Sequence, residues 1–536
     1  MTQHSTFGRA IRWAYLMNWG EQGLSAFFSF FLASILGPSD FGIVAMGMVY
    51  ILFLQMFLDQ GLVAALIQRK DLQPEHLDSV FWMVLVISVL LVGLSLGLSP
   101  WWSAANHVPK LAAVISVLSL VLPIEALTVV QKALFQRNMD FRSLSIRSLL
   151  SVGAGGVVGI VMGLRGFGPW ALVGQRLTQD SCALVLLWGL SHWRPRLRFA
   201  GKYIRDLLGF SLANFTAKLG IFANFQAEAF FMGLFFGPFA VGLYRFAQRL
   251  VTMVVQVSTS SLQVAAFPQF SRVQDDVAEL GRSALLCLRM SSIVTLPLMA
   301  GIAVSSRFIM GVIGPKWAMA VPVLTVLAAA GAVSSLVQFT GPLLQAKSKP
   351  HYLAGLVWIS SAIVVGTLVA LALILRHSAV SVQVTGIAFA RLVIALVFEA
   401  PVNLYLLKRE ARISPRDILR ALLPSLIAAT GVVCVSRLWS IQALTRNLQP
   451  FYGLSMSIFL SAITAVSLLL LFDRELRRWV LAFDFGRLTL ANFRDALAAE
   501  SSSAPSRTGE MNPESRSASS GDDPLPLEST KGASLK

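Results

Sequence analysis

Apolar residues in this sequence run in long blocks, separated by short polar or Gly-Pro segments. A helix that crosses a membrane needs about 20 largely apolar residues, because the hydrocarbon core is about 30 Å thick and each residue rises about 1.5 Å. Blocks of this kind cover 13–36, 41–66, 80–98, 111–134, 144–164, 169–190, 205–235, 239–265, 283–304, 318–344, 352–375, 384–407, 417–438 and 452–472. The pattern predicts an all-α integral membrane protein with about 14 transmembrane helices.

Composition supports a membrane protein. Of the 536 residues, 55% are hydrophobic and only 13% are charged, whereas soluble domains average about 25% charged residues. The formal charge of +17 would suit a nucleic-acid partner, but its placement along the chain indicates topology instead. With a cytoplasmic N-terminus and alternating loops, about 20 lysines and arginines, Arg147 among them, fall on the cytoplasmic side and about seven on the other. This asymmetry predicts both termini in the cytoplasm and no nucleic-acid partner.

The sequence carries little sign of enzymatic chemistry. Cys182, Cys287 and Cys434 lie inside apolar blocks, and the six histidines lack the spacing of metal ligands. No nucleotide-binding, metalloprotease or serine-hydrolase motif occurs. The longest outer loop, around 99–110, contains no carboxylate. We therefore expect no metal, no cofactor and no enzymatic activity.

A Gly-Pro corner occurs twice in the chain. The stretch ASILGPSDFG at 33–42 is echoed by GLFFGPFAVG at 233–242, so that Gly42 corresponds to Gly242. We interpret the first six and the next six helices as two copies of one unit, in the same orientation because six is even. The alternative is that Gly-Pro corners recur by chance in a glycine-rich membrane protein.

This repeat predicts the domain organisation. The parts are an N-terminal six-helix bundle at 1–200, a pseudo-symmetric second bundle at 201–410, two extra C-terminal helices at 411–472, an interfacial amphipathic helix at 473–500 and a disordered cytoplasmic tail at 501–536. Arginines and a tryptophan indicate the interfacial helix. The tail is rich in serine, proline and charge, and so cannot bury enough apolar surface to fold.

Several charged residues lie inside the apolar blocks, where a charge near the bilayer centre costs at least about 3 kcal/mol. Arg245 and Arg249 are one turn apart on one helix face, and no acid lies near them in the sequence. Lys218, on the preceding helix, reaches a similar depth. We interpret these cations as lining a cavity that binds an anion. The candidate substrate-binding residues are Arg245, Arg249, Lys218, Arg176 and Arg391.

The acidic residues in the blocks allow a second interpretation. Ion pairs within one helix would neutralise several of these charges without any ligand. The pairs that the spacing allows are Arg176–Asp180, Glu125–Lys132 and Arg391–Glu399. A further use of buried acids is to couple transport to an ion. The candidates for that role are Glu21, Asp59, Glu125 and Glu228.

Four short motifs, in a fixed order, resemble one transporter family. They are LGPSDFG (36–42), DQGLVAALIQRKDL (59–72), FQRNMDFRSLSIRSLLSV (135–152) and GFGPWALV (166–173). In these motifs the sequence is similar to the Wzx-type oligosaccharide flippases. The nearest group is the WzxC-like polysaccharide-export branch of the multidrug/oligosaccharidyl-lipid/polysaccharide (MOP) superfamily. The resemblance implies two six-helix bundles around a central cavity, two extra helices and a bacterial inner membrane.

The resemblance also implies a function. The cargo would be a lipid-linked oligosaccharide repeat unit on polyprenyl pyrophosphate, moved by alternating access for exopolysaccharide, O-antigen or capsule synthesis. Its pyrophosphate would suit Arg245, Arg249 and Lys218, which are chosen for burial and charge because the family shares no invariant catalytic motif. Membrane lipids, a polymerase and a chain-length regulator are the implied partners.

Two alternatives stay open. A multidrug or cation antiporter of the same superfamily would have twelve helices and an acid-dominated cavity. A membrane enzyme such as a glycan polymerase would need a large outer loop with catalytic residues.

Overall fold

Within the described residues, each apolar block of the sequence lies in a helix or in a short run of helices. The computed structural model describes residues 2–59, 66, 72–138, 140–198, 201–445, 449–473 and 477. The helices are α1 (Thr2–Ile35), α2 (Pro38–Asp59), α4 (Pro74–Ala105), α5 (Lys110–Leu118), α6 (Val121–Ala126), α7 (Val129–Arg137), α8 (Phe141–Leu164), α9 (Pro169–Leu190), α10 (Gly201–Arg272), α11 (Val277–Ile313), η1 (Pro315–Trp317), α12 (Ala320–Leu336), α13 (Thr340–Ala346), α14 (Pro350–Leu375), α15 (Val380–Ile394), η2 (Ala395–Glu399), α16 (Ala400–Ala411), α17 (Pro415–Thr445) and α18 (Pro450–Phe472). Within these residues there is no β-strand, which confirms the predicted all-α class.

Most of these helices are long and apolar enough to cross a membrane. Among the described residues ten qualify, or eleven if the bent pair Lys110–Ala126 and Val129–Arg137 forms one span. The helices α1 and α9 coincide with predicted blocks but are not among the ten. In α9 the reason is a polar middle, which carries two glutamines, an arginine and an aspartate. The chain is a multi-pass membrane protein, while the number of fourteen spans stays a prediction.

Two blocks predicted as single helices are broken at corresponding places in the two halves. Block 111–134 forms α5, α6 and α7, and block 318–344 forms α12 and α13. Before α7 the Thr128 hydroxyl donates to the Glu125 carbonyl oxygen (2.8 Å). A side chain therefore satisfies a backbone acceptor near the end of α6. Before α13 the Thr340 N–H donates to a carbonyl only three residues back (3.3 Å), which tightens the turn. The recurrence agrees with the predicted repeat.

The second Gly-Pro corner divides α10 into two helices. Gly237 has φ 77° and ψ −178°, a conformation that interrupts the helix and that glycine adopts without a steric penalty. Pro238 then begins the second part of α10, where its missing N–H costs nothing. At the first corner Pro38 begins α2 in the same way.

The two corners pack directly against each other. A Cβ atom on Gly42 would lie 1.7 Å from the carbonyl oxygen of Pro238, and one on Gly242 would lie 1.8 Å from the carbonyl oxygen of Pro38. Because both distances are far shorter than a van der Waals contact, only glycine fits at either position. The contact is reciprocal, which is the signature of two equivalent surfaces related by a two-fold axis. Each corner is therefore the packing partner of the other.

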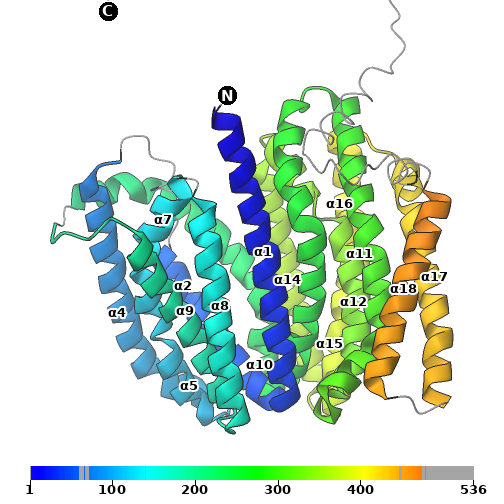
Figure 1. Ribbon diagram of the computed structural model, residues 1–536, viewed down its shortest axis with the longest axis horizontal. Helices are drawn as coiled ribbons and strands as arrows, with labels where there is room; N and C mark the ends of the chain where they lie inside the picture. The colour runs from blue at the N-terminus through cyan, green and yellow to red at the C-terminus, as the bar shows by residue number, and fades with distance from the viewer. Residues whose placement is uncertain are drawn as a thin grey trace, which may run out of the picture. The chain divides into compact units, whose positions relative to one another are not determined.

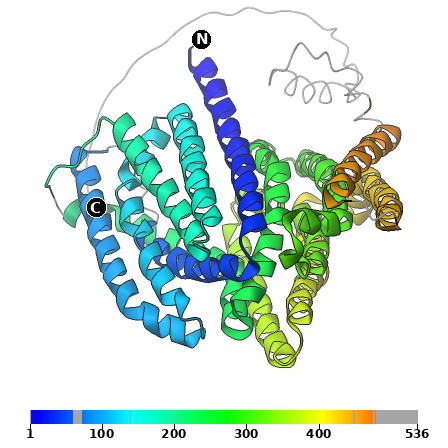
Figure 2. The same ribbon diagram turned by 60° about the horizontal axis from the view of Figure 1, so that its bottom comes forward.

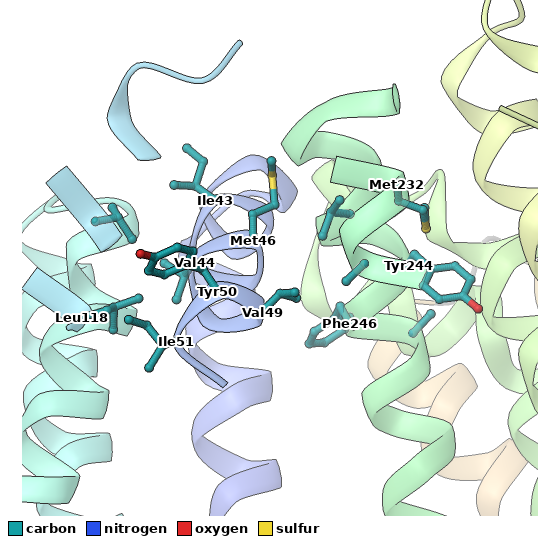
Figure 3. Packing of buried hydrophobic residues seen from close by; sticks show 14 of the residues in the cluster. Ile43, Val44, Met46, Val49, Tyr50, Ile51, Leu118, Met232, Tyr244 and Phe246 are labelled. Atoms are coloured by element: carbon teal, nitrogen blue, oxygen red, sulfur yellow. The ribbon is translucent and has the colours of Figure 1, made fainter. Parts of the chain in front are cut away.

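Apolar side chains extend this crossing into a continuous core. Figure 3 shows residues of α2, among them Met46 and Val49, beside Phe246 and other residues of α10. The same buried cluster continues into α4, α5, α12 and α15. Trp317 is fully buried and donates its indole N–H to the carbonyl oxygen of Ala33 (2.8 Å). The end of α1 is therefore tied to the segment after α11.

The helices that bound the site lie around α1 and α10. In Figure 1, α4, α5, α8 and α9 lie on one side of α1, and α11, α12, α17 and α18 on the other. The pair α17 and α18 packs against α11, at one edge of the described helices in both views (Figures 1 and 2). The predicted interfacial helix (473–500), apart from Asp473 and Arg477, and the predicted tail (501–536) lie outside the described residues. The boundaries of the two bundles stay predictions.

Candidate functional site

A cavity of about 560 Å³ lies between α1, α2, α9 and the part of α10 that follows Gly237. The helix α2 contributes apolar residues to it, and the other three helices contribute its polar wall. The polar lining residues are Glu21, Gln22, Ser25, Gln175, Arg176, Gln179, Arg245, Gln248, Arg249, Thr252 and Gln256. Three arginines and one glutamate thus face one cavity among apolar helices.

One stripe of α10 carries much of this polarity. Arg245, Gln248, Arg249, Thr252 and Gln256 recur at three- and four-residue spacing, so they project from one helix face. The sequence predicts this shared face for Arg245 and Arg249, and the structure places both in the cavity. The opposite face of α10 is apolar and packs into the core.

Arg245 and Arg249 have different partners. Arg245 donates to the amide oxygens of Gln248 (3.0 Å) and Gln226. Arg249 donates to the hydroxyl oxygen of Ser25 on α1 (2.6 Å). In the described part of the chain, neither arginine has a carboxylate within ion-pair distance. Their charge is therefore available to an anion that enters the cavity.

Arg176 faces the same cavity from α9 but is already paired. Its Nε lies 2.6 Å from Oδ2 of Asp180, which is the pairing that the sequence spacing allows. Arg176 and Asp180 also line a second cavity, of about 210 Å³. The two cavities share Glu21, Arg176 and Gln179 as a common wall.

The second cavity is balanced in charge. Its ionisable lining residues are Glu21, Glu125, Lys132, Arg147, Arg176 and Asp180. Glu21 accepts a hydrogen bond from Ser148 (2.5 Å), and Glu125 accepts one from Gln55 (2.6 Å). Arg147, which the charge pattern counts with the cytoplasmic residues, lies two turns into α8 and lines this cavity. The positive excess thus lies in the larger cavity, on Arg245 and Arg249.

Arg391 belongs to a separate ion-pair cluster. Its Nη1 lies 2.6 Å from Glu399, and its Nε lies 3.6 Å from Glu228. Gln248 donates to the other oxygen of Glu228 (2.7 Å), and so links this cluster to Arg245. Arg391 does not line the larger cavity. Direct substrate binding by Arg391 would require the loss of two ion pairs, because two carboxylates already hold its charge.

The side chains of Lys218 and Asp59 lie outside the described residues, so their roles stay predictions. Of the other candidates for ion coupling, Glu21 and Glu125 line the second cavity, and Glu228 is paired with an arginine. The cavity glutamines are not among the sequence candidates. A sequence signal for them does exist: polar residues recur one turn apart on α9 and on α10, just as Arg245 and Arg249 do.

Comparison with known proteins identifies the family. A family model described as polysaccharide biosynthesis protein matches residues 31–322, which is more than half of the chain. The chain belongs to this family. Among curated proteins it is similar to the succinoglycan biosynthesis transport protein ExoT of Rhizobium meliloti, with 29% identity over 325 residues, 60% of this chain and 66% of that protein.

Two further relatives lie in different biosynthetic systems. The teichuronic acid biosynthesis protein TuaB of Bacillus subtilis is 28% identical over 301 residues, 55% of this chain and 62% of that protein. The lipopolysaccharide biosynthesis protein WzxC of Escherichia coli is 24% identical over 323 residues, 59% of this chain and 65% of that protein. The chain therefore matches slightly less than two thirds of the length of each relative. The resemblance to the WzxC-like branch is confirmed.

Solved structures confirm the fold. The lipid II flippase MurJ, in an inward closed conformation, has a TM-score of 0.66 and 13% identity, and the match covers 87% of this chain and 99% of that protein. An inward-facing multidrug transporter of the MATE family, from the MOP superfamily, has a TM-score of 0.57 and 16% identity, covering 73% and 96%. At these identities the likeness establishes the fold alone.

Proposed function

We propose that this protein is a flippase that moves a lipid-linked oligosaccharide repeat unit from the cytoplasmic to the outer leaflet of the bacterial inner membrane. The observation that carries the proposal is the cavity of about 560 Å³, whose lining among the described residues includes three arginines and one glutamate. The relatives support a saccharide cargo, since they are named for succinoglycan, teichuronic acid and lipopolysaccharide biosynthesis.

The cavity suits the pyrophosphate of a polyprenyl carrier. A pyrophosphate cannot cross the hydrocarbon core unaided, because the loss of water around its charges is very costly. Arginine offers paired N–H donors in a plane that matches phosphate oxygens. Arg249, held by a hydroxyl, and Arg245, held by two amides, supply this charge without a competing ion pair. Lys218 would add a third cation.

Transport would follow from the duplicated architecture. The cavity takes its walls from α1, α2 and α9 of the predicted first bundle (1–200) and from α10 of the second (201–410). Rocking of the two bundles around this site would expose it to each side of the membrane in turn. In this scheme both termini are cytoplasmic, and a polymerase and a chain-length regulator act on the exported cargo.

The antiporter alternative fits the charges less well. A cavity for organic cations would need carboxylates in excess over cations, whereas Arg176, Arg245 and Arg249 outnumber Glu21 here. The two extra C-terminal helices predicted at 411–472, which correspond to α17 and α18, would also exceed the twelve of such an antiporter. These features favour an anionic cargo.

Deletion of the gene tests the proposal. Lipid-linked repeat units should accumulate on the cytoplasmic leaflet, where an impermeant sugar-modifying reagent reaches them in inverted vesicles but not in right-side-out vesicles. Re-expression of the wild-type protein should restore export. If the repeat units of the deletion strain lie on the outer leaflet, as in the parent, the protein is not their flippase.

A further inference from the structure

Four glutamines and one threonine that line the larger cavity are not used by the arginines described above. Gln22, Gln175, Gln179, Thr252 and Gln256 line this cavity, and none of these side chains makes a hydrogen bond within the part of the chain that the structure describes. An amide inside a membrane helix is costly to leave without a partner. Their partner must therefore enter from the cavity, as water or as cargo.

These side chains form two rows on two walls of the cavity. Gln175 and Gln179 are one turn apart on α9, and Thr252 and Gln256 are one turn apart on α10. Gln256 follows Arg249 by two turns, which places it about 10 Å further along the helix. Arg249 and Gln256 can therefore contact different parts of one molecule.

The chemistry of an amide matches a sugar better than a phosphate. An amide has two N–H donors and one acceptor oxygen, and each sugar hydroxyl also donates and accepts. Phosphate oxygens only accept, so an amide oxygen beside them would be repelled. Gln248 shows the contrast, because Arg245 and Glu228 already occupy both ends of its amide. Gln248 therefore has a structural role, whereas the side chains of the two rows have donors and acceptors left for a ligand.

We propose that Gln175, Gln179, Thr252 and Gln256 form a subsite for neutral hexose units of the cargo, beside the arginines that hold its charged group. This proposal rests on the flippase function proposed above. A cargo with hydroxyls at this place satisfies the amides, whereas a cargo without them leaves polar groups unpaired and loses affinity. The two rows would therefore determine which saccharides are accepted.

Binding to two probes tests the subsite. The full-length protein in lipid nanodiscs is titrated with decaprenyl diphosphate and with decaprenyl diphosphate that carries a glucose disaccharide. The wild-type protein should bind the glycosylated probe more tightly. Gln179→Ala and Gln256→Ala should each weaken that binding about two- to tenfold, the loss expected for one hydrogen bond, and leave the bare probe unaffected.

Two further variants serve as controls. Arg249→Ala should weaken the binding of both probes, because it removes charge rather than an amide. Gln345→Ala replaces an exposed glutamine on α13, outside the cavity, and should change neither affinity. If an alanine variant has a lowered melting temperature, Gln179→Asn and Gln256→Asn keep the amide group and report a shift in its position.

Each outcome separates the two proposals. The subsite is overturned, and the flippase function left standing, if the wild-type protein binds both probes equally. The same holds if a variant that combines Gln179→Ala with Gln256→Ala keeps the wild-type preference for the glycosylated probe. If well-folded glutamine variants lose affinity for both probes to the same extent, the amides bind the diphosphate, and the subsite is again overturned. If the wild-type protein binds neither probe, both proposals are wrong.

Discussion

Arg249 and Arg391 are the same side chain inside membrane helices, in opposite surroundings. Arg391 lies 2.6 Å from Glu399 and 3.6 Å from Glu228, so its charge is neutralised. Arg249 donates to the hydroxyl of Ser25 and faces the larger cavity. A cation that is paired with acids on other helices holds those helices together. A cation that faces a cavity and has no ion-pair partner can instead attract an anionic ligand. The partners of a buried arginine, more than its burial, indicate its role.

The largest effect is expected at the paired arginine. Arg391→Ala leaves the buried Glu228 and the partly buried Glu399 without a cation, and breaking a buried pair typically costs about 3–5 kcal/mol of folding free energy. We expect a lower melting temperature in detergent and less protein in the membrane. Adding Glu228→Gln and Glu399→Gln should restore both. Normal stability together with lost export would make Arg391 a binding residue and break the comparison.

Loss of function without loss of stability is expected at the cavity arginines. In the proposed function Arg249 donates charged hydrogen bonds to the diphosphate of the cargo, and Arg249→Ala removes them. Such bonds are worth about 1.5–3 kcal/mol, or roughly ten- to a hundredfold in affinity for decaprenyl diphosphate. Arg249→Lys should retain more activity, since it keeps the charge but loses the paired geometry. Arg307→Ala, at an exposed site on α11, is the matched control. Full export by an Arg245→Ala/Arg249→Ala variant at normal protein level would exclude both residues from binding.

A smaller effect is expected from moving the cavity wall itself. Gly242 lies two residues before the buried Tyr244 and on the same helix segment as Arg249, so Gly242→Ala must push α2 and α10 apart at their crossing. Overpacking of this kind costs about 1–3 kcal/mol, and we expect reduced export with a moderately lower melting temperature. Gly93→Ala is the control, because a Cβ there meets nothing within 4 Å. Identical behaviour of the two variants would show that the crossing tolerates a side chain.

The smallest effect is expected at Ser25. Ser25→Ala removes one hydrogen bond from Arg249, and water in the cavity can replace it at little cost. Export and melting temperature should therefore stay close to those of the wild-type protein. A loss of export as large as that of Arg249→Ala would mean that the hydroxyl positions the guanidinium, which would refine the comparison.

The helices are predictable from the sequence to the extent that their signal is local. An apolar block of sufficient length must form a helix in a membrane, because no water is present to satisfy its backbone groups. The corner at Gly237 and Pro238 is predictable for the same reason, since both residues act on their own backbone. The break before α7 is not, because the hydrogen bond from Thr128 to the carbonyl of Glu125 is one that a threonine can also make inside an unbroken helix, so the residue type alone does not mark a break.

The candidate site is predictable only in part. The shared face of Arg245 and Arg249 follows from their spacing, and so does the pairing of Arg176 with Asp180. The pairing of Arg391 with Glu228 joins residues far apart in the sequence, which no local spacing reveals. Which face of α9 meets the cavity likewise depends on how four helices pack. The sequence of α9 alone therefore does not identify its glutamines as cavity residues.

The crossing at Gly42 and Gly242 has a mechanical consequence. At this point backbone meets backbone, since each glycine lies against the carbonyl group of the other corner's proline. The crossing lies near one end of α2, and from Gly42 to Asp59 that helix extends about 25 Å at about 1.5 Å per residue. A turn of about 10° at this pivot would therefore displace the far end by about 4 Å. If the two predicted bundles rock about this crossing, the pair of glycines converts a small rotation into a larger displacement at the far end of α2.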